Sequence, residues 1–292
     1  MKKVGFIGMG IMGLPMATNI LKKSGCSVIG FDVVETSRAK FAEAGGIATA
    51  NAKEVYENCE VIFLCLPKNE LVESTVKDII AQGKKGTVII DFSSTFPGVI
   101  RKLYPEVKAA GMSLIDSPVS GGETGAVAGT LVVMCGGDKE VFDEVEELIA
   151  CVGSRVTYMG STGCGDVAKL ANNMIVGCNL IAVSEAYSFA VKAGLNPEVL
   201  FNAIKDGFAQ NAVMDIKVPK IISRDFSASA RIAVHQKDMR NAAQLAEDMG
   251  VEIPMSALVL NYMNRMEEAG LINEDQCALV KMFEKDMDVE VK

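Results

Sequence analysis

The stretch Val4-Gly-Phe-Ile-Gly8-Met-Gly10-Ile-Met-Gly13 opens the chain, and a second apolar run after it ends at Asp32. The apolar residues before Gly8 have the pattern of a buried strand, and the glycines permit a sharp turn into a helix. In this spacing Gly8 allows the tight turn, Gly10 lets a ligand approach the backbone, and Gly13 allows close packing of helix and strand. The stretch therefore predicts a strand, a glycine turn and a helix in immediate succession.

A helix that begins at such a turn offers unpaired N–H groups and a positive dipole end, which suit a diphosphate. Asp32 follows the second strand, where a carboxylate can accept the hydrogen bonds of a ribose diol. Together these features predict a dinucleotide site. The charge of Asp32 opposes a 2′-phosphate and favours NAD, whereas Arg38, six residues on, leaves NADP open as the alternative.

The composition limits the other classes of function. The 292-residue chain has a formal charge of −8, which argues against a nucleic-acid partner. It contains a single histidine, and its eight cysteines show no CxxC pair, so we expect buried thiols and no metal site. Glycines interrupt the first apolar run, which is unlike a signal peptide. We therefore expect a cytoplasmic protein with no membrane partner.

The first half of the chain alternates short β-rich runs with amphipathic helices, which indicates a parallel sheet covered by helices. The expected strands are 3–7, 27–31, 60–66, 87–91, 113–116, 131–135 and 155–159. The expected helices include 12–23, 36–44, 70–81, 98–110 and 139–151. The runs 113–116 and 131–135 lie so close together that the sheet is expected to have a mixed edge.

The pattern changes after about residue 162. Residues 166–193 form one long helical pattern, whose apolar centre is interrupted by polar residues and is expected to be too short and too polar to cross a bilayer. Further helices are expected near Asn196-Pro197, near Asp215, around Lys237, and after Pro254 and Asn273. The sequence thus predicts a doubly wound, Rossmann-type α/β domain (1–162), then an all-helical domain (163–292), joined by the long interdomain helix.

Two stretches, Leu64-Cys-Leu-Pro67 and Asp91-Phe-Ser-Ser-Thr95, end expected strands at the edge where open α/β sheets bind ligands. The alternative is ordinary strand-to-loop chemistry, in which Pro67 stops a strand and Ser94 or Thr95 caps a helix. For Thr95 the two interpretations have equal weight. In a third stretch, Asp116-Ser-Pro-Val-Ser120-Gly121-Gly122, paired glycines beside a hydroxyl can hold a carboxylate with backbone N–H groups. A plain turn is the alternative there.

Lys169 and Asn173 lie four residues apart, on one face of the long helix near its start. A lysine there can give a proton to an alkoxide as hydride reaches a carbonyl, and Asn173 can orient the lysine or a substrate hydroxyl. Spacing alone leaves a solvated helix face as the alternative. In the run His235-Gln-Lys237-Asp238, Lys237 can pair with a substrate carboxylate, whereas His235 is expected to be structural.

Taken together, these stretches resemble the β-hydroxyacid dehydrogenase family over essentially the whole chain. Four stretches match in order: Gly5–Gly13 with Pro15-Met16-Ala17, Asp116–Gly122, Gly163–Asn173, and Lys237-Asp238. The resemblance implies Lys169 as general acid/base with Asn173 beside it, and a substrate site made by Ser120, Gly121, Gly122 and Lys237. It also implies a homodimer or homotetramer. The expected cofactor-binding residues are Gly8, Met9, Gly10, Ile11, Met12, Gly13, Asp32, Leu64, Leu66, Pro67, Thr95 and Lys237.

The expected activity is the NAD(P)-dependent interconversion of a short 3-hydroxy acid and its semialdehyde, without a metal. Segments of the second half, such as Lys205-Asp-Gly-Phe and Gln276-Cys-Ala-Leu-Val, resemble tartronate semialdehyde (2-hydroxy-3-oxopropionate) reductases. The alternatives within the family act on 3-hydroxyisobutyrate, 4-hydroxybutyrate or 2-(hydroxymethyl)glutarate. A decarboxylating sugar-acid dehydrogenase would carry a longer helical domain, and a non-catalytic dinucleotide sensor would not need Lys169.

Overall fold

Strand and helix alternate from the first described residue, and they build a single mixed sheet. The computed structural model describes residues 3–292, which divide into one compact unit ending at Lys169 and a second unit, Leu170–Lys292. The strands are β1 (Lys3–Ile7), β2 (Ser27–Phe31), β3 (Ile47–Thr49), β4 (Val61–Leu64), β5 (Val88–Asp91), β6 (Ser113–Asp116), β7 (Val119–Ser120), β8 (Leu131–Gly136) and β9 (Gly153–Gly160). The helices of the first unit are α1 (Gly13–Lys23), α2 (Glu35–Glu43), α3 (Ala52–Asn58), α4 (Asn69–Gln82), α5 (Pro97–Ala109), α6 (Gly122–Ala128) and α7 (Lys139–Ile149).

The order of the strands is that of a doubly wound dinucleotide-binding sheet. Strands β3-β2-β1-β4-β5-β6 are parallel, and β8 then runs antiparallel to β6 and β7, with β9 parallel to β8. The strand order reverses at β1 and β4, which is where ligands bind in such sheets. The predicted fold class is confirmed, including the mixed edge.

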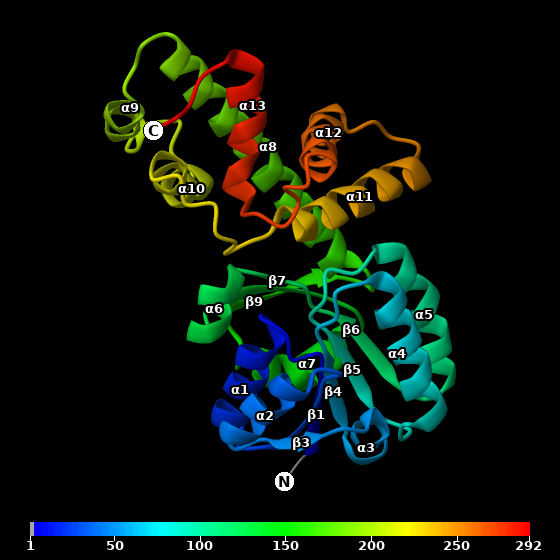
Figure 1. Ribbon diagram of the computed structural model, residues 1–292. Coiled ribbons are helices and arrows are strands. Elements are labelled where there is room, and N and C mark those ends of the chain that lie inside the picture. Colours follow the sequence, from blue (N-terminus) through cyan, green and yellow to red (C-terminus); the bar gives the residue numbers. More distant parts are fainter. Residues whose placement is uncertain (1–2) are drawn as a thin grey trace. The chain divides into compact units, whose positions relative to one another are not determined.

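Alternating side chains along the strands feed two separate cores, one on each face of the sheet. In β1, Phe6 belongs to the core that includes residues of α1 and α7, whereas its neighbour Ile7 belongs to the core that includes residues of α3, α4 and α5. Phe63 and Phe92 extend the Phe6 side, with ring centroids 5.0 Å apart. Figure 1 shows α4 and α5 together on one side of the strands and α1 and α2 on the other. Burial on both faces explains why the strand sequences are continuously apolar.

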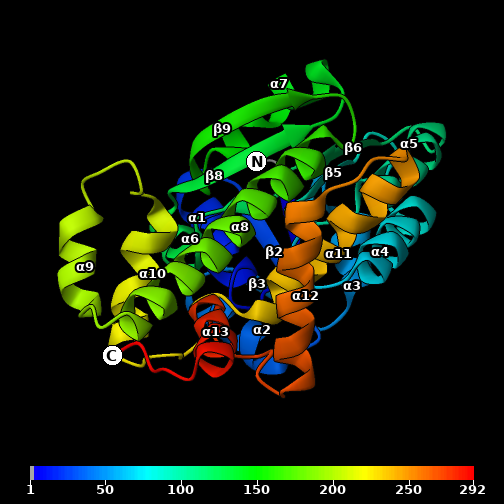
Figure 2. The same ribbon diagram turned by 90° about the horizontal axis from the view of Figure 1, so that it is seen from above.

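The second unit is helical, as expected. Helix α8 (Cys164–Lys192) carries the chain from the first unit into the second. It is followed by α9 (Pro197–Ile204), α10 (Ala212–Ile222), α11 (Ile232–Met249), α12 (Pro254–Glu268), the 3₁₀ turn η1 (Gln276–Leu279) and α13 (Val280–Met287). One core joins α8 to α11 and α12, and another joins α8 to α10 and η1. In Figure 2, α11 and α12 accordingly lie on one side of α13, and α9 and α10 on the other.

Several short elements and helix starts differ from expectation. The sequence pattern does not predict β3 with α3 or β7 with α6, because each element is too short to show a clear period. Helix α10 begins at Ala212 because the Asn211 side chain accepts the Met214 N–H, 2.9 Å away. Helix α11 begins at Ile232, earlier than expected, because the Glu274 and Ile272 carbonyls accept its first two N–H groups.

Helix α8 also differs from expectation in its apolar character. It is the one helix within residues 3–292 that is long and apolar enough to cross a membrane, with 29 residues and a mean hydropathy of 1.5 in its best window. The expectation that this segment is too short and too polar is therefore wrong on length and composition. These two properties are weak evidence of a span, because the core helix of a water-soluble protein shares them.

Candidate active site

The register of the parallel strands brings the predicted cofactor-binding residues to one edge of the sheet. Ile7 pairs with Phe31 on one side and Leu64 on the other, and Leu64 pairs with Asp91. The residues that follow these strand ends therefore share the edge: the glycine turn, Asp32, the Leu66-Pro67 loop and the Ser93–Thr95 loop. Hydrogen bonding joins two of these loops, since the Leu66 N–H donates to Ser93 Oγ, 2.8 Å away.

The glycine turn fits a diphosphate. Gly8 has a φ of +92°, and a Cβ there would lie 2.3 Å from the Cys65 carbonyl oxygen. A Cβ at Gly13 would lie 1.9 Å from the Gly8 carbonyl oxygen, whereas one at Gly10 would meet nothing within 4 Å. Helix α1 has no side-chain cap and no acidic residue in its first turn. The first turn of α1 therefore sets no negative charge against its positive dipole end, which suits a bound anion.

Alanine at Gly13 and at Gly10 should separate folding from cofactor binding. Gly13→Ala places its methyl group against the Gly8 carbonyl and should lower the melting temperature markedly. Gly10→Ala meets no protein atom, so the melting temperature should hold while affinity for the dinucleotide falls by about tenfold or more. Thermal unfolding and NADH fluorescence titration measure the two effects. Unchanged NADH affinity in Gly10→Ala would contradict the assignment of this turn to the diphosphate.

Asp32 is buried in the turn after β2 and already holds protein N–H groups. Its Oδ2 accepts the Met9 N–H at 2.6 Å, and its Oδ1 accepts the Val34 N–H at 2.7 Å. Each carboxylate oxygen retains acceptor capacity for a ribose hydroxyl. Arg38 Nη1 donates to the Asp32 carbonyl at 2.7 Å and to the Val33 carbonyl at 3.2 Å, so that nitrogen supports the turn itself.

The other predicted cofactor-binding residues differ in whether their side chains are exposed enough to contact a cofactor. The side chains of Met9 and Leu64 are fully buried in the two cores, which leaves only their main chains to face a ligand. Ile11 is exposed, Met12 and Leu66 are partly buried, and Pro67 is exposed.

Thr95 is not a helix cap, contrary to one of the two interpretations. The N-cap of α5 is Phe96, without a side-chain hydrogen bond. The Thr95 hydroxyl instead donates to Asp91 Oδ2 at 2.6 Å, and the Thr95 N–H donates to Asp166 Oδ1 at 3.1 Å. Asp166 lies in the first turn of α8, so Thr95 links the end of β5 to that helix.

A buried carboxylate at the end of β6 fixes the start of α8. Asp116 Oδ1 accepts the Gly163 N–H at 2.8 Å, and Oδ2 accepts the Asp166 N–H at 3.0 Å. Burial raises the pKa of the Asp116 carboxyl, and these N–H groups offset only part of that shift. Gly165 makes the approach possible, since a Cβ there would lie 2.3 Å from the Met134 carbonyl oxygen. Asp116 thus serves as a helix cap supplied from a distant strand.

Lys169 follows Asp166 by one helical turn and is partly buried. The bonds of Asp116 and Asp166 therefore hold the turn that carries Lys169 at the ligand-binding edge of the sheet. Ser120 lies at the end of β7, opposite Val132 of β8. Gly121 and Gly122 after it have φ values of +135° and +61°, and both are exposed. This backbone geometry is compatible with the predicted carboxylate-binding turn, and the roles of these residues stay predictions.

In the second unit, Asn173 lies one turn beyond Lys169 on α8 and is held by α11. Its Nδ2 donates to Asp238 Oδ2 at 2.6 Å, and Lys237 Nζ lies 3.1 Å from Asp238 Oδ1. Asp238 is almost fully buried, whereas Lys237 is a quarter exposed. Asp238 therefore positions the side chains of two predicted site residues. His235 Nε2 lies 2.8 Å from the Asn173 carbonyl oxygen, which agrees with the expected structural role.

Sequence reasoning missed Asp116 and Asp166 as tethers of α8. Their partners lie far away in the chain, for example 71 residues from Asp166 to Thr95, and no local spacing signals such pairs. Among residues 3–292, no group of three or more His, Cys, Asp or Glu side chains is placed to hold a metal ion.

Comparison with known proteins assigns the family. A family model described as the NAD binding domain of 6-phosphogluconate dehydrogenase matches residues 3–160. A second, described as NAD-binding of NADP-dependent 3-hydroxyisobutyrate dehydrogenase, matches residues 163–283.

Individual relatives match along their whole length. The chain is 34% identical to 2-(hydroxymethyl)glutarate dehydrogenase of Eubacterium barkeri, covering 99% of this chain and 97% of the relative. It is also 34% identical to 2-hydroxy-3-oxopropionate reductase of Escherichia coli K12, covering 97% of each. The solved structure of Mycobacterium tuberculosis 3-hydroxyisobutyrate dehydrogenase with L-serine has a TM-score of 0.89 at 27% identity, covering 97% of this chain and 99% of that one.

The fold and the matched domains define an NAD(P)-dependent oxidoreductase. The chain belongs to the β-hydroxyacid dehydrogenase family. Its cofactor is NAD(P), and the predicted family and class of activity are confirmed.

Proposed function

We propose that the chain is a 2-hydroxy-3-oxopropionate (tartronate semialdehyde) reductase in which Lys169 transfers the proton. The nicotinamide would supply the hydride that reaches the aldehyde carbon. Lys169 would give its proton to the oxygen that becomes the new hydroxyl, and would take it back in the oxidative direction. The observation that carries this role is the pair of tethers, Asp116 and Asp166, that fixes the Lys169 turn at the ligand-binding edge of the sheet.

The remaining predicted residues would bind and orient the acid. The N–H groups of the Ser120–Gly122 turn and the Lys237 ammonium would hold the substrate carboxylate. Asn173 would orient the reacting hydroxyl. A substrate of three or four carbons needs such polar anchors more than apolar area. A cytoplasmic location and a homodimer or homotetramer belong to the same proposal.

Steady-state rates on a panel of acids test the choice of substrate. All acids are assayed in the oxidative direction: glycerate (the reduced form of 2-hydroxy-3-oxopropionate), 3-hydroxyisobutyrate, 4-hydroxybutyrate, 2-(hydroxymethyl)glutarate and L-serine. We expect kcat/KM for glycerate to exceed the others by about tenfold or more, since one misplaced methylene or polar group costs that much. A highest value for 2-(hydroxymethyl)glutarate would favour the other relative at 34% identity. NADH binding without turnover of any acid would favour the alternative that the protein is a non-catalytic dinucleotide sensor.

We also propose a preference for NAD over NADP. The buried Asp32 carboxylate carries its charge where a 2′-phosphate would approach, and one Arg38 nitrogen is occupied by the turn's own carbonyls. Repulsion between the Asp32 carboxylate and a 2′-phosphate would weaken the binding of NADP. On the best substrate, kcat/KM for the NAD form should exceed that for the NADP form by about tenfold or more. Equal kcat/KM values for the two cofactors, or a higher value for NADP, would show that Arg38 binds the 2′-phosphate and offsets the charge of Asp32.

A further inference from the structure

The single histidine of the chain is buried beside Asn173, and its bonds define its proton arrangement. His235 lies in the first turn of α11 and is 1% exposed. The Gln276 amide nitrogen lies 2.9 Å from Nδ1 and can only donate, so Nδ1 accepts. In the neutral ring the proton is then on Nε2, which donates it to the Asn173 carbonyl oxygen 2.8 Å away.

The backbone of α8 is shaped to receive this ring. The Asn173 carbonyl faces the turn that contains Gly177, and a Cβ at Gly177 would lie 2.8 Å from Val259 Cγ1 and 3.5 Å from His235 Nε2. Gly177 therefore lets α11 and α12 approach the helix closely enough for the ring to reach a main-chain oxygen. Without that approach the carbonyl would have only its partner within the helix.

Helix α11 holds Asn173 at two points. His235 binds its main chain, and Asp238, three residues later on the same face, accepts its side-chain amide at 2.6 Å. Asp238 also pairs with Lys237. One turn of α11 thus restrains the backbone and the side chain of Asn173 at the same time, and this restrains both the position and the rotamer of the amide.

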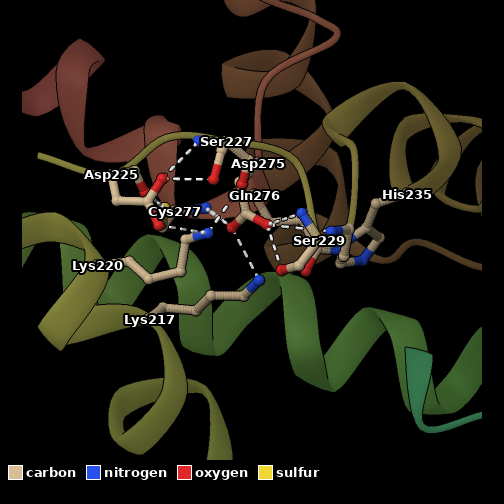
Figure 3. A network of polar contacts seen from close by, with 10 residues as sticks. Lys217, Lys220, Asp225, Ser227, Ser229, His235, Asp275, Gln276 and Cys277 are labelled. Atoms are coloured by element: carbon tan, nitrogen blue, oxygen red, sulfur yellow. Dashed lines mark hydrogen bonds and ion pairs between the residues drawn. The ribbon is translucent and has the colours of Figure 1, made fainter. Parts of the chain in front are cut away.

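Gln276 is fixed in turn by a buried ionic network, shown in Figure 3. Its neighbour Asp275 is fully buried and accepts from Lys217 Nζ at 2.8 Å and from the Ala230 N–H at 3.0 Å. The Gln276 N–H donates to the Ala230 carbonyl at 2.9 Å. The residue that selects the histidine tautomer is therefore itself immobilised.

We propose that His235 is a positioning residue for Asn173, held by Gln276 in the neutral form with the proton on Nε2. The proposal rests on the proposed function, because Asn173 acts on the substrate only if that function holds. A reacting group displaced by about 1 Å can cost about a hundredfold in rate. A buried histidine that only packed α11 against α8 would have no such effect on turnover.

Two amide substitutions isolate the bond to Asn173. The amide nitrogen of His235→Gln reaches the position of Nε2, whereas that of His235→Asn reaches only the position of Nδ1. Both variants bury one amide, so their melting temperatures should be similar. We expect kcat at saturation to fall about 10- to 100-fold in His235→Asn and to stay within about threefold of wild type in His235→Gln. The affinity for NADH should be unchanged in both.

Equal kcat in the two variants, or loss of kcat in proportion to loss of melting temperature, would overturn the proposal. Imidazole ¹⁵N NMR of the unmodified protein gives an independent test, because its one histidine yields a single spin system. A protonated Nε2 and a bare Nδ1 near neutral pH are expected, and the opposite tautomer would overturn the proposal. If Asn173→Ala keeps full turnover, the proposed function fails; if it loses turnover while His235→Asn does not, this inference alone fails.

Discussion

Replacing Lys169 by methionine should remove turnover while leaving cofactor binding intact. Methionine keeps much of the length and the helix propensity of lysine but has no proton to transfer. General acid–base catalysis contributes about 10²- to 10⁴-fold, so kcat should fall by about that factor with the best substrate. NADH affinity should stay near wild type, because the dinucleotide is expected to bind the glycine turn and Asp32. Stopped-flow turnover and fluorescence titration measure the two quantities separately.

Lys192, in the last turn of the same helix, provides the matched control. Its Nζ lies at the surface, 3.4 Å from the Asp288 carbonyl oxygen. Lys192→Met makes the same chemical change in α8 and should leave kcat unchanged. Loss of NADH binding in Lys169→Met would show a disturbed fold, and full turnover in that variant would remove Lys169 from the mechanism.

Replacing Lys217 by methionine should produce the largest loss of stability in the helical unit. Lys217 Nζ lies 2.8 Å from Asp275 Oδ1, with side-chain exposures of 8% and 0%. Removing one partner leaves an uncompensated buried charge, which costs about 3–5 kcal/mol of unfolding free energy. Equilibrium urea unfolding followed by circular dichroism measures this loss.

An exposed pair in the same unit gives the comparison. Arg240 Nη2 lies 2.7 Å from Glu267 Oε2, but both side chains are about half exposed. Arg240→Met should therefore cost about 0–1 kcal/mol. Similar costs for Arg240→Met and Lys217→Met would mean that the buried pair does not hold the unit together.

The buried pair of Lys217 and Asp275 also makes the stability of the protein depend on pH. Burial alone would raise the pKa of the Asp275 carboxyl, but Lys217 and the N–H donors around it outweigh burial and hold that pKa well below its usual range. The stability that Asp275 contributes is thus present above its unfolded pKa of about 3.9, and is lost as pH falls below that value toward the folded pKa. In Lys217→Met, the unfolding free energy should therefore fall less steeply as the pH is lowered through this range.

The fold and the cofactor site of the first unit could be predicted from the sequence because the residues that determine them lie close together in the chain. The strand, glycine turn, helix, second strand and Asp32 all lie within the first 32 residues, and each has a steric or electrostatic reason for its place. The two apolar faces of each strand likewise follow from the local pattern. Short elements such as β3 and α6 were missed because three to seven residues do not establish a period.

The polar tethers could not be predicted for the opposite reason. Asp116 meets Gly163 across 47 residues, and His235 meets Asn173 across 62. Each local sequence is compatible with an ordinary turn or a polar helix start, and only the folded chain pairs them. The sequence and the family resemblance named Lys169 and Asn173, whereas the structure supplied the groups that hold them.

Chemical rescue of Lys169→Ala by methylamine tests the central claim most directly. The assay follows NADH formation in the oxidative direction with the hydroxy acid, where no aldehyde is added that could trap the amine. If the Lys169 amine carries the proton, the variant should be about 10²- to 10⁴-fold slower than wild type, and methylamine should restore part of the rate in proportion to its free-base concentration. Wild-type turnover in Lys169→Ala without any added amine would contradict the account.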